Sequence, residues 1–412
     1  PRRAGPSRLE EVVAQLEGLA LPWSALSQSI LPARLDDFDP RLLDMLAASG
    51  EIVWVGRGAL GAADCRIALY RRDRVADLLA PPEALEDASE LHHAILDHLG
   101  RRGASFTVEL ERLVAETERV ELEPVLWDLV WAGSITNDTF LPLRELGRPR
   151  RRGRAGGSRG ARGTGRRRGT GPRLGGGRWS RVVDLLDGPE EDTVAATRRA
   201  HALAVSLLER YGIVSRESAL AEEIPGGFAA LYPVLQEMED AGRVRRGYFV
   251  EGLSGRQFAL PGAVDRLRAE REEGSEILVL PAVDPANPWG ALLPWPEGGI
   301  EDGPRPRRVA GAWLVLEGGA PLLFLESSQR SVVTFRPFTE RVEGRRATPA
   351  IVALQEITRE QRRRSLLLER IDGLPAREWP GVAAFLEAGF ERDYRGVSWS
   401  LGPGTTARRS GA

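Results

Sequence analysis

The residues best suited to chemistry in this chain are arginines that are interleaved with aromatic side chains between residues 243 and 256. Arginine binds phosphate oxygens through a planar set of donors, and aromatic rings stack on the bases of single strands. The combination is typical of contact with a nucleic-acid backbone. The alternative is that the apolar residues here form only the core face of a hairpin. The predicted nucleic-acid-binding residues are Arg243, Arg245, Arg246, Tyr248 and Arg256.

Two tryptophans, Trp289 and Trp295, stand among prolines and a glycine in a loop-like segment. Exposed tryptophans in such a loop stack on bases or wedge strands apart, so we include both among the predicted nucleic-acid-binding residues. Two alternatives stay open at this point. The rings either lock the loop onto its own domain or form part of a subunit interface, where tryptophan is enriched.

A strongly basic run covers residues 147–178, with twelve arginines and no acidic residue. A segment so poor in apolar residues buries too little surface to fold, so it is predicted to be a disordered linker. Such an arm binds polyanions without sequence preference, or it is simply a solvated tether. The arginines expected to contact a polyanion are Arg150, Arg151, Arg152, Arg166, Arg167 and Arg168.

Signals for catalysis and for metal binding are weak. All 57 basic residues are arginine, so a phosphate-binding loop of the Walker A type, which requires lysine, is impossible here. We therefore expect no ATP hydrolysis and no cofactor or metal in this chain. His92 and His93 are adjacent and point in different directions on a helix. Asp393, near Phe390 and Tyr394, is the single weak catalytic candidate, with a turn or cap role as the alternative.

Composition indicates a water-soluble, multidomain chain. At 412 residues it is long enough for roughly two to four domains, and 42% of its residues are hydrophobic. No apolar run approaches the roughly 18 residues that a membrane helix requires. A single cysteine, Cys65, is consistent with a reducing compartment, and we expect a cytoplasmic location. The absence of an initiator methionine suggests a fragment of a longer chain.

The arginine-aromatic cluster follows a helix whose apolar residues have helical spacing: Phe228, Leu231, Tyr232, Leu235 and Met238. Gly242 is a typical helix stop, and two short alternating runs then flank a glycine-containing loop. This order of a short helix, a longer helix and a hairpin predicts a winged helix-turn-helix over residues 179–273. The arginines would lie on its wing.

The same order recurs along the chain, which predicts a tandem array. We expect winged-helix modules at 1–83 and 84–146 before the linker. Short apolar strands separated by glycine and proline predict a small antiparallel β-barrel-like domain at 274–345. A C-terminal α/β segment at 346–401 and a tail at 402–412 complete an α+β multidomain chain.

Four ungapped stretches resemble the C-terminal region of the large helicase-related (Lhr) DNA repair helicases. They are 51–56 (EIVWVG), 225–235 (PGGFAALYPVL), 242–252 (GRVRRGYFVEG) and 284–290 (DPANPWG). The resemblance implies an ATP-driven 3′-to-5′ DNA translocase of superfamily 2 whose motor, with its ATP and magnesium, lies outside this chain. It also implies tandem winged helices plus a barrel, a relation to certain DNA glycosylases, and oligomerisation.

The glycosylase motif implied by that relation is absent. Glycosylases of the related group use a Gln-x-Gln or Gln-x-Asp pair to position water, and none of the glutamines in this chain is followed two residues later by Gln or Asp. Direct transfer of glycosylase activity therefore has no support from this motif.

Two functional hypotheses follow. In the first, the chain is an accessory region that holds single-stranded or non-specific DNA through arginine wings and the basic arm. In the second, it is a module for homo-oligomerisation, because the expected recognition helices expose acids such as Glu123, Asp128, Glu237 and Asp240. Such acids repel phosphate and disfavour the reading of base sequence.

Overall fold

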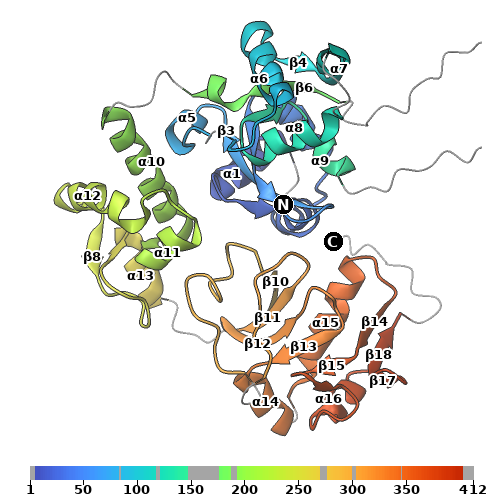
Figure 1. The fold of residues 1–412 in the computed structure, drawn as a ribbon. Helices are drawn as coiled ribbons and strands as arrows, with labels where there is room; N and C mark the ends of the chain where they lie inside the picture. The colour runs from blue at the N-terminus through green and yellow to red at the C-terminus, as the bar shows by residue number, and fades with distance from the viewer. Residues whose placement is uncertain are drawn as a thin grey trace, which may run out of the picture. The chain divides into compact units, whose positions relative to one another are not determined.

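The computed structural model divides the chain into two compact units, residues 1–206 and 207–412. The dividing line falls within one long helix, α10 (Thr193–Tyr211). Each unit is described separately below (Figure 1). The structure describes residues 5–82, 85–116, 121–146, 176–186, 193–269, 276–298, 303–344 and 346–401.

The first module of the N-terminal unit has the predicted order of helices followed by a hairpin. Its apolar helix faces are buried, as in α1, where Leu9, Val12, Val13 and Leu16 lie inside. The sheet order is β1-β3-β2, with β2 and β3 antiparallel. The elements are α1 (Pro6–Leu16), β1 (Leu21–Pro22), α2 (Trp23–Ala25), a π-helical turn (Leu26–Ile30), α3 (Leu31–Arg34), α4 (Arg41–Ala48), β2 (Ile52–Ala59), β3 (Cys65–Arg71) and α5 (Val75–Leu78).

The second module contains a strand that falls mostly within the range predicted for the third. Strand β6 lies between β4 and β5 in an antiparallel sheet. The predicted boundary at residue 179 is therefore wrong, because the buried Trp179 anchors this strand and its indole Nε1 donates to Thr107 Oγ1 at 3.0 Å. The elements are α6 (Glu90–Arg102), β4 (Ser105–Phe106), α7 (Thr107–Glu116), α8 (Leu122–Trp131), β5 (Ile135–Asn137), α9 (Leu141–Glu145), β6 (Arg178–Arg181) and a 3₁₀ turn (Val182–Leu185).

The predicted linker at 147–178 thus falls between two strands of one sheet, β5 and β6, and its last residue, Arg178, is already the first residue of β6. Apart from residues 176–178, it lies outside the described residues, and so do its six arginines named above. The predicted tail at 402–412 is outside them as well.

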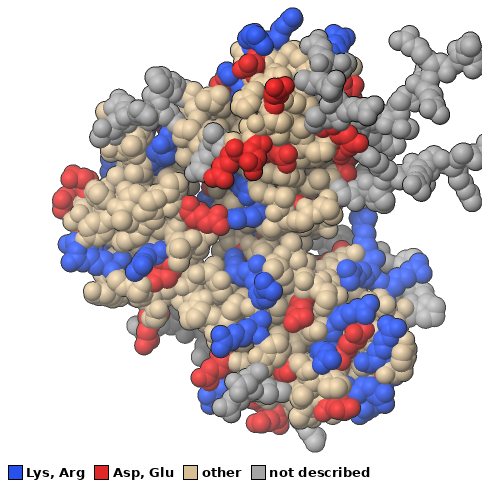
Figure 2. Space-filling model, viewed as in Figure 1, with Lys and Arg blue, Asp and Glu red and all other residues tan. Residues whose placement is uncertain are grey.

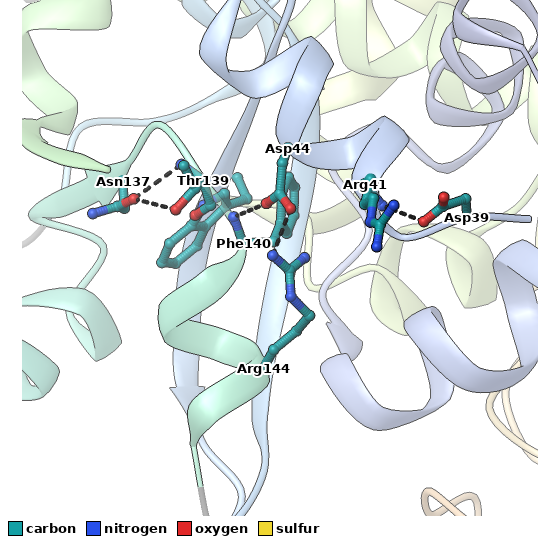
Figure 3. A network of polar contacts seen from close by, with 8 residues as sticks. Asp39, Arg41, Asp44, Asn137, Thr139, Phe140 and Arg144 are labelled. Carbon is teal, nitrogen blue, oxygen red and sulfur yellow. Dashed lines mark hydrogen bonds and ion pairs between the residues drawn. The ribbon is translucent and has the colours of Figure 1, made fainter. Parts of the chain in front are cut away.

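A polar network joins the two modules of the N-terminal unit (Figure 3). The Asp44 carboxylate on α4 accepts the backbone N–H of Phe140 at 2.8 Å and pairs with Arg144 on α9. Close backbone packing accompanies it, because a Cβ at Gly56 of β2 would lie 2.0 Å from the Val130 carbonyl of α8. The indole of Trp54 also donates to the Thr139 carbonyl at 3.0 Å. The two modules therefore share one packed interior.

The third module belongs to the C-terminal unit except for residues 193–206, the greater part of α10. An aromatic cluster of Phe228, Tyr232 and Phe258 packs its long helix against the hairpin, as the helical spacing predicts. The sheet order is β7-β9-β8, which leaves β8 as an edge strand. The elements after α10 are β7 (Ile213–Val214), α11 (Arg216–Ala221), α12 (Gly227–Asp240), β8 (Arg245–Gly247), β9 (Gln257–Ala259) and α13 (Pro261–Ala269).

The rest of the C-terminal unit is built on a six-stranded sheet in the order β10-β11-β12-β13-β15-β16, in which β13 and β15 are parallel. A second sheet has the order β14-β18-β17. The elements are β10 (Ile277–Pro281), β11 (Trp313–Glu317), β12 (Ala320–Leu325), β13 (Ser331–Thr334), α14 (Arg336–Glu343), α15 (Thr348–Glu360), β14 (Ser365–Leu368), β15 (Arg370–Ile371), β16 (Leu374–Pro375), α16 (Val382–Glu387), β17 (Glu391–Arg392) and β18 (Val397–Ser400).

The described strands of this part form open sheets and no closed barrel, so the barrel-like prediction is not supported. Both faces of the large sheet are covered. Trp313 and Val315 of β11 face a core that includes α15, whereas Leu314 and Leu316 face the loop that carries Trp289 and Trp295. Strands covered on both faces are continuously apolar, which is why their sequence resembles that of a small barrel. The predicted boundary at 345 is also wrong, because β15 and β16 join the same sheet.

A buried carboxylate fixes the turn between β15 and β16. Asp372, 5% exposed, accepts the Thr334 backbone N–H at 2.7 Å, the Thr334 hydroxyl at 2.8 Å and the Trp379 indole N–H at 2.9 Å. Asp372 and Gly373 both have positive φ, as an Asp-Gly hairpin turn requires. The turn is therefore attached to both β13 and the segment before α16.

We expect Asp44→Ala to loosen the joint between the first two modules. The substitution leaves the Phe140 amide and the Arg144 guanidinium without their acceptor, which costs about 1–3 kcal/mol. Hydrogen exchange of the full chain should become faster at the amide of Phe140. In the control, Glu11→Ala removes an exposed ion pair with Arg8 and should leave that exchange unchanged. Unaltered protection of Phe140 in the Asp44 variant would contradict the proposed joint.

Burial raises the pKa of Asp372 above its ordinary value of 3.8, while its three donors act in the opposite direction. A group whose native pKa is raised stabilises the fold fully below its unfolded pKa, and this contribution is lost as pH rises through the native pKa. The stability difference between wild type and Asp372→Ala should therefore be largest near pH 4 and narrow toward neutrality. Urea unfolding across this range measures it. A difference that widens with pH would show that the donors outweigh burial.

Candidate nucleic-acid interface

The wing of the third module is held in shape by one buried side chain, Gln257. Its Oε1 accepts the backbone N–H groups of Phe249 and Val250, both at 2.9 Å, and its Nε2 donates to the Val250 carbonyl at 3.0 Å. Gln257 is 0% exposed. The loop therefore keeps a defined conformation although only three residue pairs join β8 to β9.

The predicted binding residues of the wing are all exposed at its surface. Arg243, Arg245 and Tyr248 lie on or beside β8, and Tyr248 is 80% exposed. Arg246 Nε lies 3.3 Å from Glu239 Oε2, and Arg256 donates to the Tyr232 hydroxyl. The Arg256 guanidinium is the main cause of a lowered pKa at Tyr232. The structure thus brings the five residues together on one hairpin, with two arginines oriented by neighbours.

The long helix α12 presents the opposite charge. Glu237 and Asp240 are exposed on it, and its buried positions are Leu231, Leu235 and Met238. Figure 2 shows basic and acidic side chains as separate patches over this module. An acidic helix disfavours insertion into a DNA groove, whereas a basic wing suits contact with phosphates.

The two tryptophans pack against the large sheet. Trp295 is stacked on Phe335 with ring centroids 6.1 Å apart and meets Phe324 edge-on at 5.5 Å. The Trp289 indole donates to the Gly319 carbonyl at 3.1 Å. Both rings are half-buried, so the geometry favours the packing alternative, and contact with nucleic acid stays a prediction for them.

Asp393 has a structural task in the turn between β17 and β18. Its carboxylate accepts the backbone N–H of Arg395 at 2.9 Å, and its own backbone N–H donates to the Gly396 carbonyl at 3.0 Å. These contacts are those of a turn residue, the alternative to a catalytic role. Within the described ranges, no group of three His, Cys, Asp or Glu side chains is arranged to hold a metal ion.

His92 is a capping residue, because its Nδ1 accepts the Ser89 backbone N–H at 3.0 Å at the start of α6. Burial raises the pKa of the Cys65 thiol to about 12, so this cysteine is unreactive near neutral pH. None of the helices in the described part of the chain is both long and apolar enough to cross a bilayer.

Sequence reasoning missed one basic cavity in the C-terminal unit, with a volume of about 440 Å³. Its lining residues are far apart in sequence and carry no motif, so the only signal available was a general richness in arginine. They are Arg330, Glu369, Arg370, Pro375 and Arg395.

Comparison with known proteins agrees with this architecture. Two family models, each described as a winged-helix domain of the large helicase-related protein, match residues 1–72 and 193–278. They cover the first and third modules and confirm the winged-helix prediction for both.

Two curated relatives match over nearly the whole chain. The Mycolicibacterium smegmatis protein named "Lhr helicase/ probable uracil glycosylase" is 40% identical over 95% of this chain. The Escherichia coli protein named "Lhr helicase/uracil glycosylase" is 35% identical over 96% of it. The chain spans only 27% and 26% of their respective lengths.

Among solved structures, the Streptomyces sahachiroi DNA glycosylase AlkZ is similar, with a TM-score of 0.43 and 16% identity. The match covers 90% of this chain and 99% of that one. At this level the likeness supports no conclusion about activity. The two domain matches and the two relatives show that this chain belongs to the large helicase-related family.

Proposed function

We propose that this chain is an accessory region of a helicase-family protein and that it holds single-stranded DNA through the wing of its third module. The observation that carries this proposal is the set of exposed arginines around Tyr248 on a hairpin fixed by buried Gln257. Guanidinium groups contact phosphates without regard to base sequence, and an open aromatic ring accepts a stacked base.

The family relationship supports a link to an ATP-driven 3′-to-5′ translocase, because both relatives are named helicases. The present chain contains no lysine, so it lacks the residue through which a Walker A loop reaches the nucleotide phosphates. Under this proposal DNA repair, ATP and magnesium belong to the whole helicase in the cytoplasm, and the chain itself contributes DNA contact.

Removal of uracil from DNA is a second candidate, favoured by the words "uracil glycosylase" in the names of both relatives. The test is incubation of the chain with a uracil-containing oligonucleotide, followed by alkaline cleavage of abasic sites. Alkali-labile product that disappears with Asp393→Asn would establish the activity at this residue. Product that persists in this variant would assign the activity to other residues. If the wild type forms no product, DNA binding is the one proposed activity that remains.

Homo-oligomerisation is compatible with either activity and rests on apolar side chains at the surface of the second module. Phe106 is 53% exposed and its neighbour in α7, Val108, is 57% exposed. Adjacent exposed apolar residues are typical of protein–protein contact. Sedimentation velocity of the chain should show a species larger than a monomer, and a monomer at all concentrations would rule this out.

The wing contact predicts a specific loss of DNA binding. The variant Arg245→Ala/Arg246→Ala should bind an oligothymidylate more weakly than wild type in fluorescence anisotropy. Each lost phosphate contact reduces the slope of log K against log salt by about 0.7 on single strands, so the double variant should lose about 1.4.

The matched control is Arg266→Ala/Arg268→Ala, which removes two exposed arginines from α13 of the same module. It should retain the wild-type slope. Binding that weakens equally in both variants would indicate a general charge effect, and an unaltered slope in the wing variant would refute the wing contact.

A further inference from the structure

We propose that the basic cavity of the C-terminal unit is a second nucleic-acid site, which binds one nucleotide of a DNA strand by its phosphate. The inference extends the proposed function to a surface that no sequence motif marks. Three guanidinium groups and one carboxylate line the cavity, so its lining carries a net positive charge. Figure 2 shows basic side chains gathered over the part of this unit that contains β14, β15, β17 and β18.

The first two arginines are brought together by the parallel pairing of β13 with β15. The Arg330 carbonyl accepts the backbone N–H of Glu369 at 2.7 Å and that of Arg370 at 3.1 Å. The guanidinium of Arg370 then donates to the Gly373 carbonyl at 2.7 Å in the turn that Asp372 anchors. Its side chain is therefore held at the cavity before any ligand arrives.

The third arginine comes from the turn between β17 and β18, which is packed tightly against the end of β14. A Cβ at Gly396 would lie 2.0 Å from the Leu368 carbonyl oxygen and 3.0 Å from the Cα of Glu369, so only glycine allows this approach. The contact places the neighbouring Arg395 beside Glu369, where the nearest distance between their charged atoms is 4.0 Å.

Among the residues that the structure describes, Glu369 is the one carboxylate that lines the cavity, and two arginines share it. Its Oε1 lies 2.7 Å from Arg330 Nη1 and 4.0 Å from Arg395 Nη1. One carboxylate does not neutralise three guanidinium groups, and the Arg370 guanidinium donates to a neutral acceptor, the Gly373 carbonyl. An anion that entered the cavity would be attracted by the positive charge that Glu369 leaves unneutralised. It would compete with Glu369 for the guanidinium groups.

A ring for base stacking stands at the edge of the cavity. Tyr394 is 77% exposed, and the Arg395 guanidinium lies over it, 5.1 Å from the ring centroid. Two more arginines surround this turn, since Arg377 donates to the Tyr394 carbonyl and Arg392 to the Arg377 carbonyl, both at 3.4 Å. A phosphate site next to an open aromatic ring has the chemistry of a nucleotide.

The size of the cavity agrees with such a ligand, because about 440 Å³ falls within the range of small-molecule sites. A phosphate in a DNA strand and the phosphate of a free nucleotide share this chemistry. Binding of an oligothymidylate, of thymidine monophosphate and of inorganic phosphate to the full chain therefore distinguishes the sources.

The decisive variants change affinity in opposite directions. Arg370→Ala/Arg395→Ala should weaken oligothymidylate binding about tenfold at moderate salt and reduce the salt slope by about 1.4. Glu369→Gln removes the competing carboxylate while keeping its shape, and it should tighten binding several-fold. Damage to the fold alone does not produce tighter binding. Tyr394→Ala should weaken binding of the oligonucleotide and leave inorganic phosphate unaffected.

The matched control is Arg336→Ala/Arg363→Ala, which removes two exposed arginines of the same unit outside the cavity. It should bind as wild type does. The inference is overturned if the control weakens binding as much as the cavity variant, or if Glu369→Gln does not tighten it. Oligonucleotide binding without thymidine monophosphate binding assigns the site to a strand, and binding of both assigns it to any nucleotide.

The wing and the cavity are tested by separate variants, so either proposal can be refuted without the other. If the wing variant loses DNA binding and the cavity variant does not, this inference is refuted and the proposed function stands. The reverse result would keep the cavity and remove the wing. Losses in both, with a larger loss in the combined variant, are the result that we expect.

Discussion

Buried or half-buried polar side chains that accept backbone N–H groups from a neighbouring segment are the interactions on which this structure depends. Gln257 does so in the wing, and Asp372 does so in the turn beside the basic cavity. In the N-terminal unit, Asp44 binds the Phe140 amide. Each side chain satisfies donors that would otherwise be costly to bury. Exposed arginines repel one another, so turns that carry them need such internal attachment to keep one conformation.

The helical part of the fold was predictable because helical spacing is a local signal. The spacing from Phe228 to Met238 placed α12, and the glycines after it placed the wing. The predicted boundary at 179 put most of β6 in the wrong module because the partners of this strand lie across the arginine-rich run. The large sheet was expected to be a barrel because apolar strands do not reveal whether a helix or another strand covers them. Its parallel pair, β13 with β15, joins residues distant in sequence.

The two candidate sites also differ in whether local sequence reveals them. The wing arginines are close in sequence and were found from their alternation with aromatic residues. The cavity arginines, Arg330, Arg370 and Arg395, line one cavity only after segments distant in sequence have come together, so no spacing rule identifies them. The chain contains arginine and no lysine, and a guanidinium stays protonated at any physiological pH. The wing and the cavity therefore keep their positive charge. DNA affinity should then respond to salt far more than to pH.

The most direct test of the central claim, that this chain holds DNA through fixed basic turns, is hydrogen exchange of the full chain with and without an oligothymidylate. The account predicts slower exchange upon binding at residues 243–257 of the wing and at residues 391–397 beside the cavity. Recognition helices α8 and α12 should exchange as they do in the free protein, because their exposed acids repel phosphate. Protection confined to those helices, with none in the two basic turns, would contradict it.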